Sequence, residues 1–256
     1  MAEVEDRMWY YRSLHAHVRR GLEAGLADGG LTVGGTVGAL RLQQGRPKVP
    51  GVLDAGCGTG GLILRLRHVH PDWQLSGIDF MPLACELARR RCGGDVDIRE
   101  ASITALPFDD GSFDAVVSAD VISHVDNPGA ALAEFFRVLR PGGCVVINVP
   151  AYMWLWSYHD DAVQCRHRYT RPELEALLHA AGFGGRRLTH WNALPFPLVW
   201  AKRKLFRTRH DTSDVKLYPA PIEAMFNGVM AVEHAWLRAG GRWAWGSSVF
   251  AVAEKP

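Results

Sequence analysis

The chain has 256 residues, 48% of them hydrophobic, which is enough to bury one sizeable core in a single domain or in a domain with an insertion. A formal net charge of +2 gives it no general attraction to nucleic acid, so we expect no nucleic-acid partner. The five cysteines lack metal-binding spacing, and no apolar run approaches the ~18 residues of a membrane-spanning helix, so we expect a cytoplasmic protein without a metal site.

The N-terminal segment favours a helix. Over residues 1–28, apolar and aromatic side chains recur on one face at helical spacing, and glycines end the pattern. We expect residues 1–49 to form a helical lid. The nine tryptophans are concentrated at the start and in the second half of the chain, and an aromatic excess outside a core sheet often lines a ligand pocket. Trp9 and Tyr10 are therefore candidate substrate contacts; the alternative is that such rings simply fill the core.

A glycine-rich stretch follows the first predicted strand. Val52 and Leu53 read as the end of a buried strand, Asp54 closes it, and a turn then leads into a helical run at residues 60–68. A strand, a glycine turn and a helix form a site for a nucleotide-like ligand, because the backbone approaches closely and the first N–H groups of the helix are unpaired. Taken alone, the G-x-G-x-x-G spacing of this loop also fits a dinucleotide.

Strands and helices then alternate along the chain. The predicted strands are residues 52–54, 74–79, 96–99, 113–118, 144–149, 186–191 and 247–253. Helices are predicted at residues 60–68, 82–92, 130–139 and 172–181. This order predicts an α/β fold, a Rossmann-like doubly wound sheet with helices on both faces, and it places ligands beyond the carboxyl ends of the strands.

We divide this single domain into four parts. Residues 1–49 are the N-terminal helical lid and residues 50–194 the Rossmann-like core. About fifty residues separate the last two predicted strands, which is too long for a hairpin loop. Residues 195–245 are therefore predicted to be a helical cap inserted before the final strand, residues 246–256.

Four motifs carry a resemblance to a known family. They are Val52–Gly60 (VLDAGCGTG), Gly77–Phe80 (GIDF), Ala105–Val117 (ALPFDDGSFDAVV) and Phe136–Gly143 (FRVLRPGG). In this order and spacing the chain resembles the small-molecule branch of the class I S-adenosylmethionine-dependent methyltransferases, of the methyltransferase type 11/25 kind. The resemblance implies a seven-stranded sheet whose last strand is antiparallel, and S-adenosyl-L-methionine as cofactor.

The resemblance also implies which residues bind the cofactor. They are Asp54, Gly56, Gly58, Gly60, Asp79, Phe80, Ser102, Ile103, Ala119 and Asp120. Asp79 would accept hydrogen bonds from the ribose hydroxyls. Asp54 would orient the glycine loop or meet the cofactor amino group through water, or it would act only as a structural cap. Ser102 departs from the family, which often has Asp there to accept from the adenine amino group, and a neutral hydroxyl is a weaker acceptor.

The segment from residue 150 to 171 leaves the fifth strand over the expected acceptor site. It resembles a subset of bacterial methyltransferases, often found with lipid, polyprenyl or natural-product pathways. The candidate substrate contacts here are Tyr152, Trp156, Arg166, Arg168 and Tyr169; the candidate proton acceptors are Tyr158, His159 and His167, with His124 on the loop after the fourth strand. In the structural alternative, Arg168 and Tyr169 tie this segment to the next helix, Thr170 caps that helix, and His124 only packs beside the cofactor.

The predicted cap combines apolar and basic residues. Its first part, residues 195–207, suits an anionic membrane surface or a phosphorylated amphiphile, although a solvated basic helix face is the plainer interpretation. A second amphipathic helix at residues 222–237 suits covering a pocket or forming a homodimer.

Together these features predict an S-adenosylmethionine-dependent methyltransferase, a transferase acting on a small hydrophobic or phosphorylated acceptor. Carbon methylation of an isoprenoid diphosphate is one specific version; O- or N-methylation of a natural product or lipid is the broader one. A non-catalytic cofactor-binding module and a dinucleotide-dependent dehydrogenase are the rivals from other classes.

Overall fold

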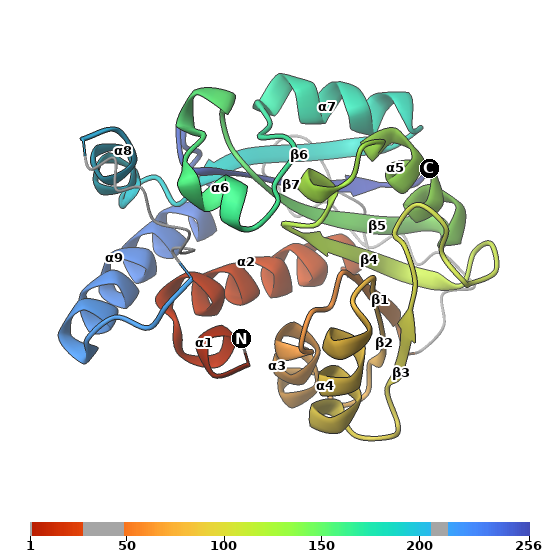
Figure 1. The fold of residues 1–256 in the computed structure, drawn as a ribbon. Coiled ribbons are helices and arrows are strands. Elements are labelled where there is room, and N and C mark those ends of the chain that lie inside the picture. Colours follow the sequence, from red (N-terminus) through yellow and green to blue (C-terminus); the bar gives the residue numbers. More distant parts are fainter. Residues whose placement is uncertain (1, 28–48, 206–214) are drawn as a thin grey trace.

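A seven-stranded sheet forms the centre of the computed structural model, which describes residues 2–27, 49–205 and 215–256 (Figure 1). The strands are β1 (Gly51–Ala55), β2 (Gln74–Asp79), β3 (Asp97–Glu100), β4 (Phe113–Ala119), β5 (Leu139–Pro150), β6 (Gly184–Trp191) and β7 (Ser248–Glu254). Their order is β3-β2-β1-β4-β5-β7-β6. Only β7 runs antiparallel, to both of its neighbours, while the other pairs are parallel. This confirms the predicted doubly wound sheet with its last strand reversed.

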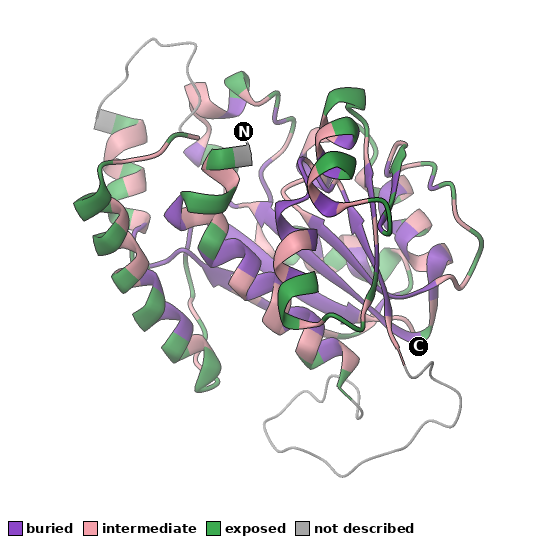
Figure 2. Ribbon diagram, turned by 90° about the horizontal axis from the view of Figure 1, so that it is seen from below, coloured by how far each residue is buried: buried purple, intermediate pink, exposed green. Residues whose placement is uncertain are grey.

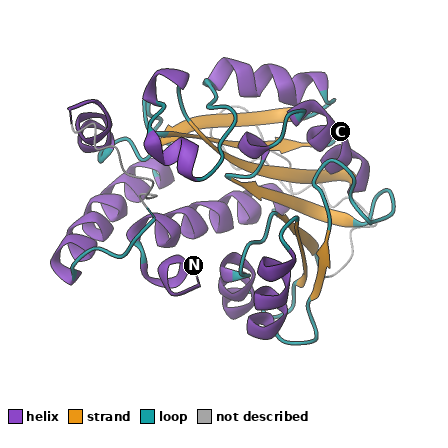
Figure 3. Cartoon of the chain, viewed as in Figure 1, coloured by secondary structure: helices purple, strands orange, loops and turns teal. Residues whose placement is uncertain are grey.

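Helices cover both faces of the sheet (Figure 3). One face packs against α2 (Trp9–Leu26), α3 (Gly61–Val69) and α4 (Pro82–Cys92), and the other against α5 (Pro128–Val138) and α7 (Arg171–Ala180). Neighbouring strand residues serve opposite faces: Val116 joins the α5–α7 core and Val117 the α2–α4 core. Consecutive buried residues, such as Ala115, Val116 and Val117 of β4, are what a parallel strand covered on both sides requires. Buried residues accordingly gather along the strands and the facing sides of the helices (Figure 2).

The N-terminal segment contains two helices where the sequence pattern predicts one. The chain breaks at Met8, an extended and buried residue, between α1 (Ala2–Arg7) and α2. The burial of Met8 anchors the break in the α2–α4 core, and α1 turns away from the line of α2 toward α3. The glycines predicted to end this helix lie outside the described residues.

Two further differences concern local order. β5 begins at Leu139, well before the predicted residue 144, because Leu139 pairs with Phe113 across an irregularity in the register. The segment after β5 also contains short helices that the sequence did not predict: the 3₁₀ turn η2 (Met153–Leu155) and α6 (Tyr158–Ala162), with η1 (Ile122–His124) after β4.

The insertion between β6 and β7 is helical, as predicted. It contains α8 (Phe196–Leu205) and α9 (Ala220–Arg238), and α9 packs against α2, where the ring of Phe226 stacks on Trp9 at 4.7 Å. The two helices project at the left of Figure 1, beyond the end of β6 and the start of β7. No helix in the described part of the chain is both long enough and apolar enough to cross a bilayer.

Helix α7 begins with the cap that the sequence predicts. Thr170 Oγ1 accepts a hydrogen bond from the Glu173 N–H at 3.4 Å, and Glu173 Oε2 accepts one from the Thr170 N–H at 2.6 Å. The side chain of each residue thus accepts a hydrogen bond from the backbone N–H of the other at the start of the helix.

Replacing Thr170 by Val should therefore lower the free energy of unfolding by about 1 kcal/mol, because the helix loses an N-cap acceptor at constant side-chain size. Urea unfolding followed by circular dichroism measures this. Thr170→Ser keeps the hydroxyl and should stay close to the wild type; equal losses in both variants would contradict the capping role.

Candidate active site

The turn after β1 depends on glycine. Gly56, Gly58 and Gly60 all have positive φ, at 104°, 52° and 83°. A Cβ at Gly56 would overlap Val121, which follows β4, whereas a Cβ at Gly58 would meet nothing within 4 Å. The loop is thus packed tightly on one side and open at Gly58, where a ligand can approach the backbone.

Asp79, the last residue of β2, holds this loop. Its Oδ2 accepts a hydrogen bond from the Gly58 N–H at 2.9 Å, and its Oδ1 accepts one from the Met81 N–H at 2.9 Å. The carboxylate is therefore fixed in orientation next to the open glycine. Phe80, the next residue, is 74% exposed.

Asp54 lies beneath the same loop and is buried. Burial, together with the neighbouring charges of Glu5 and Asp79, raises its pKa to about 8. In the free protein at neutral pH this carboxyl is therefore mostly protonated. Three acidic side chains thus lie close together around one glycine loop.

Glu5 comes from α1 and brings that helix onto the loop. Thr59 Oγ1 donates a hydrogen bond to Glu5, and Arg91 Nη2 donates to both oxygens of Asp6 at 2.7 and 2.8 Å. A side chain at Gly61 would overlap Glu5. The sequence analysis did not identify Glu5, because nothing local distinguishes it from an exposed helical acid.

A second polar group lies at the end of β4. Asp120 has a positive φ of 61°, Tyr10 Oη donates to its Oδ2 at 2.8 Å, and Asn148 Nδ2 donates to its Oδ1 at 2.7 Å. Asn148 Oδ1 in turn accepts from Trp191 Nε1 at 2.6 Å. Burial raises the pKa of Asp120, and burial and Asp120 together raise the pKa of Tyr10. The structure thus joins two predicted contacts, Tyr10 and Asp120, and adds Asn148.

The remaining predicted cofactor residues lie near the ends of β3 and β4. Ser102 Oγ is 2.8 Å from Thr104 Oγ1, so a local contact already engages the hydroxyl expected to meet adenine. Ile103 is buried and Ala119 is partly buried. Trp9 is buried against α9.

Tyr152 and Trp156, two predicted substrate contacts in the aromatic segment after β5, have different partners. Tyr152 stacks on Trp154 at 5.3 Å and on His190 at 5.4 Å, and its Oη lies 2.9 Å from His190 Nε2. Trp156 instead donates a hydrogen bond from Nε1 to Asp161 Oδ1 at 2.9 Å.

Two of the predicted substrate contacts have structural partners. Arg168 is 2% exposed, forms an ion pair with buried Asp160, and donates from Nε to the Ala151 carbonyl at 2.9 Å. Tyr169 is also buried and donates to the Ile122 carbonyl at 3.2 Å. These contacts correspond to the structural alternative, in which both residues tie the segment in place.

Arg166 remains at the surface. Its Nη1 lies 2.6 Å from Asp126 Oδ1, and its Nε donates to the His124 carbonyl at 3.1 Å. Of the two arginines predicted to contact the substrate, only this one is open to solvent.

The predicted proton acceptors His124 and His167 each contact a different part of the protein. His124 Nδ1 lies 3.2 Å from the Gln164 carbonyl, whereas His167 Nε2 lies 3.7 Å from Glu173 Oε1 and its ring packs against Tyr169. Tyr158 and His159 lie in α6. Within residues 2–27, 49–205 and 215–256, no group of three or more His, Cys, Asp or Glu is arranged to hold a metal ion.

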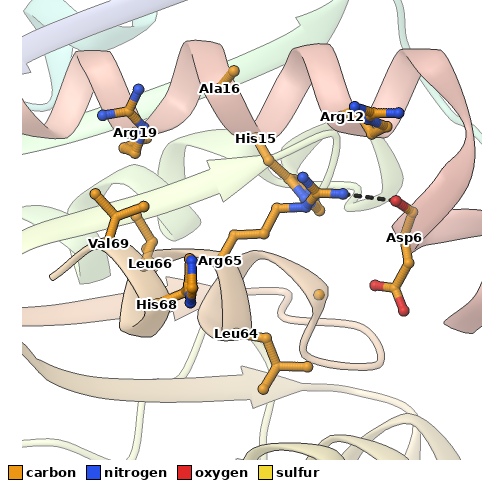
Figure 4. Close-up of a pocket in the computed structure, with 11 residues that line it drawn as sticks. Asp6, Arg12, His15, Ala16, Arg19, Leu64, Arg65, Leu66, His68 and Val69 are labelled. Atoms are coloured by element: carbon orange, nitrogen blue, oxygen red, sulfur yellow. Dashed lines mark hydrogen bonds between the residues drawn. The ribbon is translucent and has the colours of Figure 1, made fainter. Parts of the chain in front are cut away.

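A cavity of about 360 Å³ lies elsewhere, between α2 and α3 (Figure 4). Its polar lining includes His15 and Arg19 from α2 and Arg65 from α3, whose Nη2 donates to the Asp6 carbonyl at 2.7 Å. None of the residues predicted to bind cofactor or acceptor lines it. The candidate site is therefore the group of acids and glycines at the strand ends, not this cavity.

Comparison with known proteins identifies a methyltransferase domain in this part of the chain. A family model described as a methyltransferase domain matches residues 53–147. The ubiquinone/menaquinone biosynthesis C-methyltransferase UbiE of Desulfotalea psychrophila is 34% identical over 142 residues, which cover 54% of this chain and 56% of that protein. The chain spans about half the length of the curated relatives it matches.

Two solved structures show the same fold. Geranyl diphosphate C-methyltransferase from Streptomyces coelicolor A3(2) superposes with a TM-score of 0.58 at 16% identity, covering 94% of this chain and 79% of that one. The [4+2]-cyclase SpnF superposes with a TM-score of 0.58 at 20% identity, covering 94% and 80%. Because these two neighbours have different named activities, the fold alone does not fix the reaction.

The matched domain contains three of the four sequence motifs in full and most of the fourth, and it includes Asp54 near the end of β1, Asp79 at the end of β2 and Asp120 just after β4. Together with the strand order, this match supports the resemblance of the chain to the class I S-adenosylmethionine-dependent methyltransferases.

Proposed function

We propose that this protein transfers a methyl group from S-adenosyl-L-methionine to a small hydrophobic acceptor at the carboxyl ends of β1, β4 and β5. The observation that carries the proposal is the open glycine loop with its three acidic side chains. The loop lies between β1 and β4, where the strand order reverses, and ligands of doubly wound sheets bind at such switch points.

The charges of this loop suit S-adenosylmethionine, which carries a sulfonium and an ammonium group. Gly58 offers an unobstructed backbone to the methionine part of the cofactor, Glu5 and Asp79 lie nearby, and a bound cation would favour the ionised form of Asp54. Asp79, already oriented by two N–H groups, is proposed to accept from the ribose hydroxyls. Phe80, Ser102, Ile103 and Ala119 are proposed to surround the adenine; this list follows the family resemblance.

Methyl transfer is an in-line displacement: the acceptor atom forms a bond to the methyl carbon, and the sulfur keeps the electron pair of the broken bond. Alignment of the two reactants supplies up to about 7–11 kcal/mol in favourable cases. When the acceptor must lose a proton, a nearby base takes it, and a base works best when its pKa lies near the working pH.

The structure adds Asp120 to the candidate bases. Its pKa is raised by burial, it follows the strand nearest the expected transfer point, and Tyr10 and Asn148 orient its two oxygens. We propose that the Tyr10–Asp120 pair binds the acceptor and receives its proton. His124, Tyr158, His159 and His167 remain the alternatives.

The acceptor is proposed to be isoprenoid or lipid-like. A curated relative is named for ubiquinone and menaquinone biosynthesis, and a fold neighbour is named for geranyl diphosphate. A diphosphate is the less favoured form, because Arg168 is already paired inside the protein and Arg166 is paired with Asp126. A screen with methyl-labelled S-adenosylmethionine against quinone precursors and isoprenoid diphosphates tests this. Cofactor binding without turnover on any acceptor would favour a non-catalytic module.

Replacing Asp79 by Asn should weaken S-adenosylhomocysteine binding about tenfold or more, because ribose hydroxyls lose a charged acceptor. Isothermal titration calorimetry measures the dissociation constant. The Asn oxygen still accepts from the Gly58 N–H, so the loop should keep its shape, and Asp97→Asn on the neighbouring strand is the control. Equal affinities in all three proteins would refute the ribose contact.

The pKa of Asp54 predicts a pH dependence of cofactor binding. In the free protein the carboxyl is protonated below about pH 8. A bound cation favours the ionised form, so binding lowers this pKa and releases a proton, which is easier at higher pH. The advantage of the wild type over Asp54→Asn in S-adenosylmethionine affinity should therefore grow about threefold to tenfold between about pH 6 and 8.5.

Calorimetry across this pH range measures the ratio of the two dissociation constants. Taking the ratio removes the titration of the cofactor's own amino group, which is common to both proteins. Asp97→Asn should show a constant ratio. A constant ratio for Asp54→Asn would place Asp54 outside the reach of the bound cation.

Replacing Tyr10 by Phe or Asp120 by Asn should lower kcat about a hundredfold with a smaller change in KM, if the acceptor loses a proton in the reaction. In Asp120→Asn the acidic limb of the pH–rate profile should also disappear. Tyr218→Phe is the matched control for the lost hydroxyl. If both variants kept the turnover and the pH–rate profile of the wild type, the Tyr10–Asp120 pair would be ruled out as the base, and the histidines would be the candidates again.

A further inference from the structure

Helix α9 turns its two acidic side chains inward and exposes apolar ones. Glu233 is 0% exposed, and its Oε2 accepts hydrogen bonds from the N–H groups of Ala193 and Leu194 at 2.9 and 3.0 Å. Glu223 also turns inward: its Oε2 accepts from the Trp9 N–H at 2.7 Å. The hydrogen bonds of Glu223 and Glu233 therefore hold α9 against the rest of the protein.

The outer face of α9 is apolar along most of its length. Ile222, Met225, Val232 and Trp236 are 37%, 52%, 64% and 51% exposed, and Ala224, Gly228, Ala231 and Ala235 are exposed between them. This face recurs at helical spacing and has no charged side chain before Arg238. We call these exposed residues, from Ile222 to Trp236, the α9 face.

Other exposed apolar side chains of the insertion accompany the α9 face. Leu198 and Trp200 of α8 are 58% and 43% exposed, and Trp245, between α9 and β7, is 52% exposed. In α8 the sequence had indicated a basic cluster, but Arg203 turns inward and its Nη1 donates to the Leu155 carbonyl at 3.2 Å. Of the three basic residues at 202–204, only Lys204 is exposed.

The charges that remain exposed here have one sign. In the described residues of the insertion, 195–205 and 215–245, every exposed charged side chain is basic: Lys204, Lys216, Arg238 and Arg242. An apolar face with tryptophans and a cationic rim suits the interface of an anionic membrane, where rings lie at headgroup depth and cations meet lipid phosphates.

We propose that the α9 face docks this protein onto the surface of a membrane that contains anionic lipids. A second copy of the chain fits less well. A two-fold contact between α9 faces in antiparallel register would bring the Lys216 end of one helix to the Arg238 end of the other, and like charges would meet at both ends. On a membrane the same rim faces opposite charge.

The location links docking to the candidate site without depending on the proposed reaction. Phe226 of α9 stacks on Trp9 of α2. Tyr10, which follows Trp9 in α2, donates a hydrogen bond to Asp120. A docked α9 would therefore hold the start of α2, which bears one side of the candidate site, next to the lipid surface. Vesicle binding tests docking even if no methyl transfer occurs.

Flotation of the full chain with vesicles tests the proposal. Vesicles of phosphatidylcholine with about one third phosphatidylglycerol should carry the protein at low salt, and pure phosphatidylcholine should carry less. The double variant Val232→Ser/Trp236→Ser should bind the anionic vesicles at least about tenfold more weakly, because two apolar side chains leave the interface. Arg238→Gln/Arg242→Gln should lose the preference for anionic lipid.

Val69→Ser/Leu83→Ser is the matched control, since it removes two apolar side chains that are 47% and 63% exposed on α3 and α4. It should bind as the wild type does. Wild-type protein that stays off anionic vesicles would overturn the proposal, and so would unchanged binding by the α9-face variant. Analytical ultracentrifugation adds a third decisive result: a wild-type dimer that Val232→Ser/Trp236→Ser converts to monomer would assign the α9 face to a second copy.

Discussion

The turn after β1 can pass the end of β4 only because Gly56 has no side chain; a Cβ there would overlap Val121. This close passage fixes the rest of the site. It brings the N–H groups of Gly56 and Cys57 to the Ile78 carbonyl, both at 2.8 Å, and so ties the turn to β2. The next bond, from the Gly58 N–H to Asp79, then orients the carboxylate at the end of that strand. One backbone constraint thus positions both the open glycine and the acid beside it.

Acidic side chains accumulate where this backbone path leaves room. Asp54 lies under the turn and Asp79 beside it, while Glu5 arrives from α1 and Asp120 lies across the turn at the end of β4. The raised pKa of Asp54 reflects this crowding after burial itself, since Glu5 and Asp79 disfavour its ionised form. A cationic ligand relieves such repulsion, whereas an anionic dinucleotide would increase it. This electrostatic balance is the physical reason to prefer S-adenosylmethionine over a nicotinamide cofactor for a loop whose glycine spacing fits both.

Features that depend on neighbouring residues could be predicted from the sequence. The order of strands and helices along the chain and the Thr170 cap are of this kind, and the structure has both. The reversed last strand, which the structure also has, was implied by the family resemblance. Contacts between distant segments could not be predicted. Glu5 reaches the glycine loop across more than fifty residues, Asn148 meets Asp120 from another strand, and Arg168 finds Asp160 in a helix that the sequence did not show. Helical periodicity likewise indicates an amphipathic α9 but not which of its faces turns outward, so the burial of Glu233 was not foreseen.

We propose that the cofactor lies between the open glycine loop and the acids at the strand ends. A crystal structure of the chain with S-adenosylhomocysteine would show its position. We expect ribose hydroxyls within hydrogen-bond distance of Asp79, the amino-acid part of the ligand against Gly58, and α1 still in contact with Thr59 and Arg91. Ligand density in the cavity between α2 and α3, or ribose hydroxyls out of reach of Asp79, would contradict it.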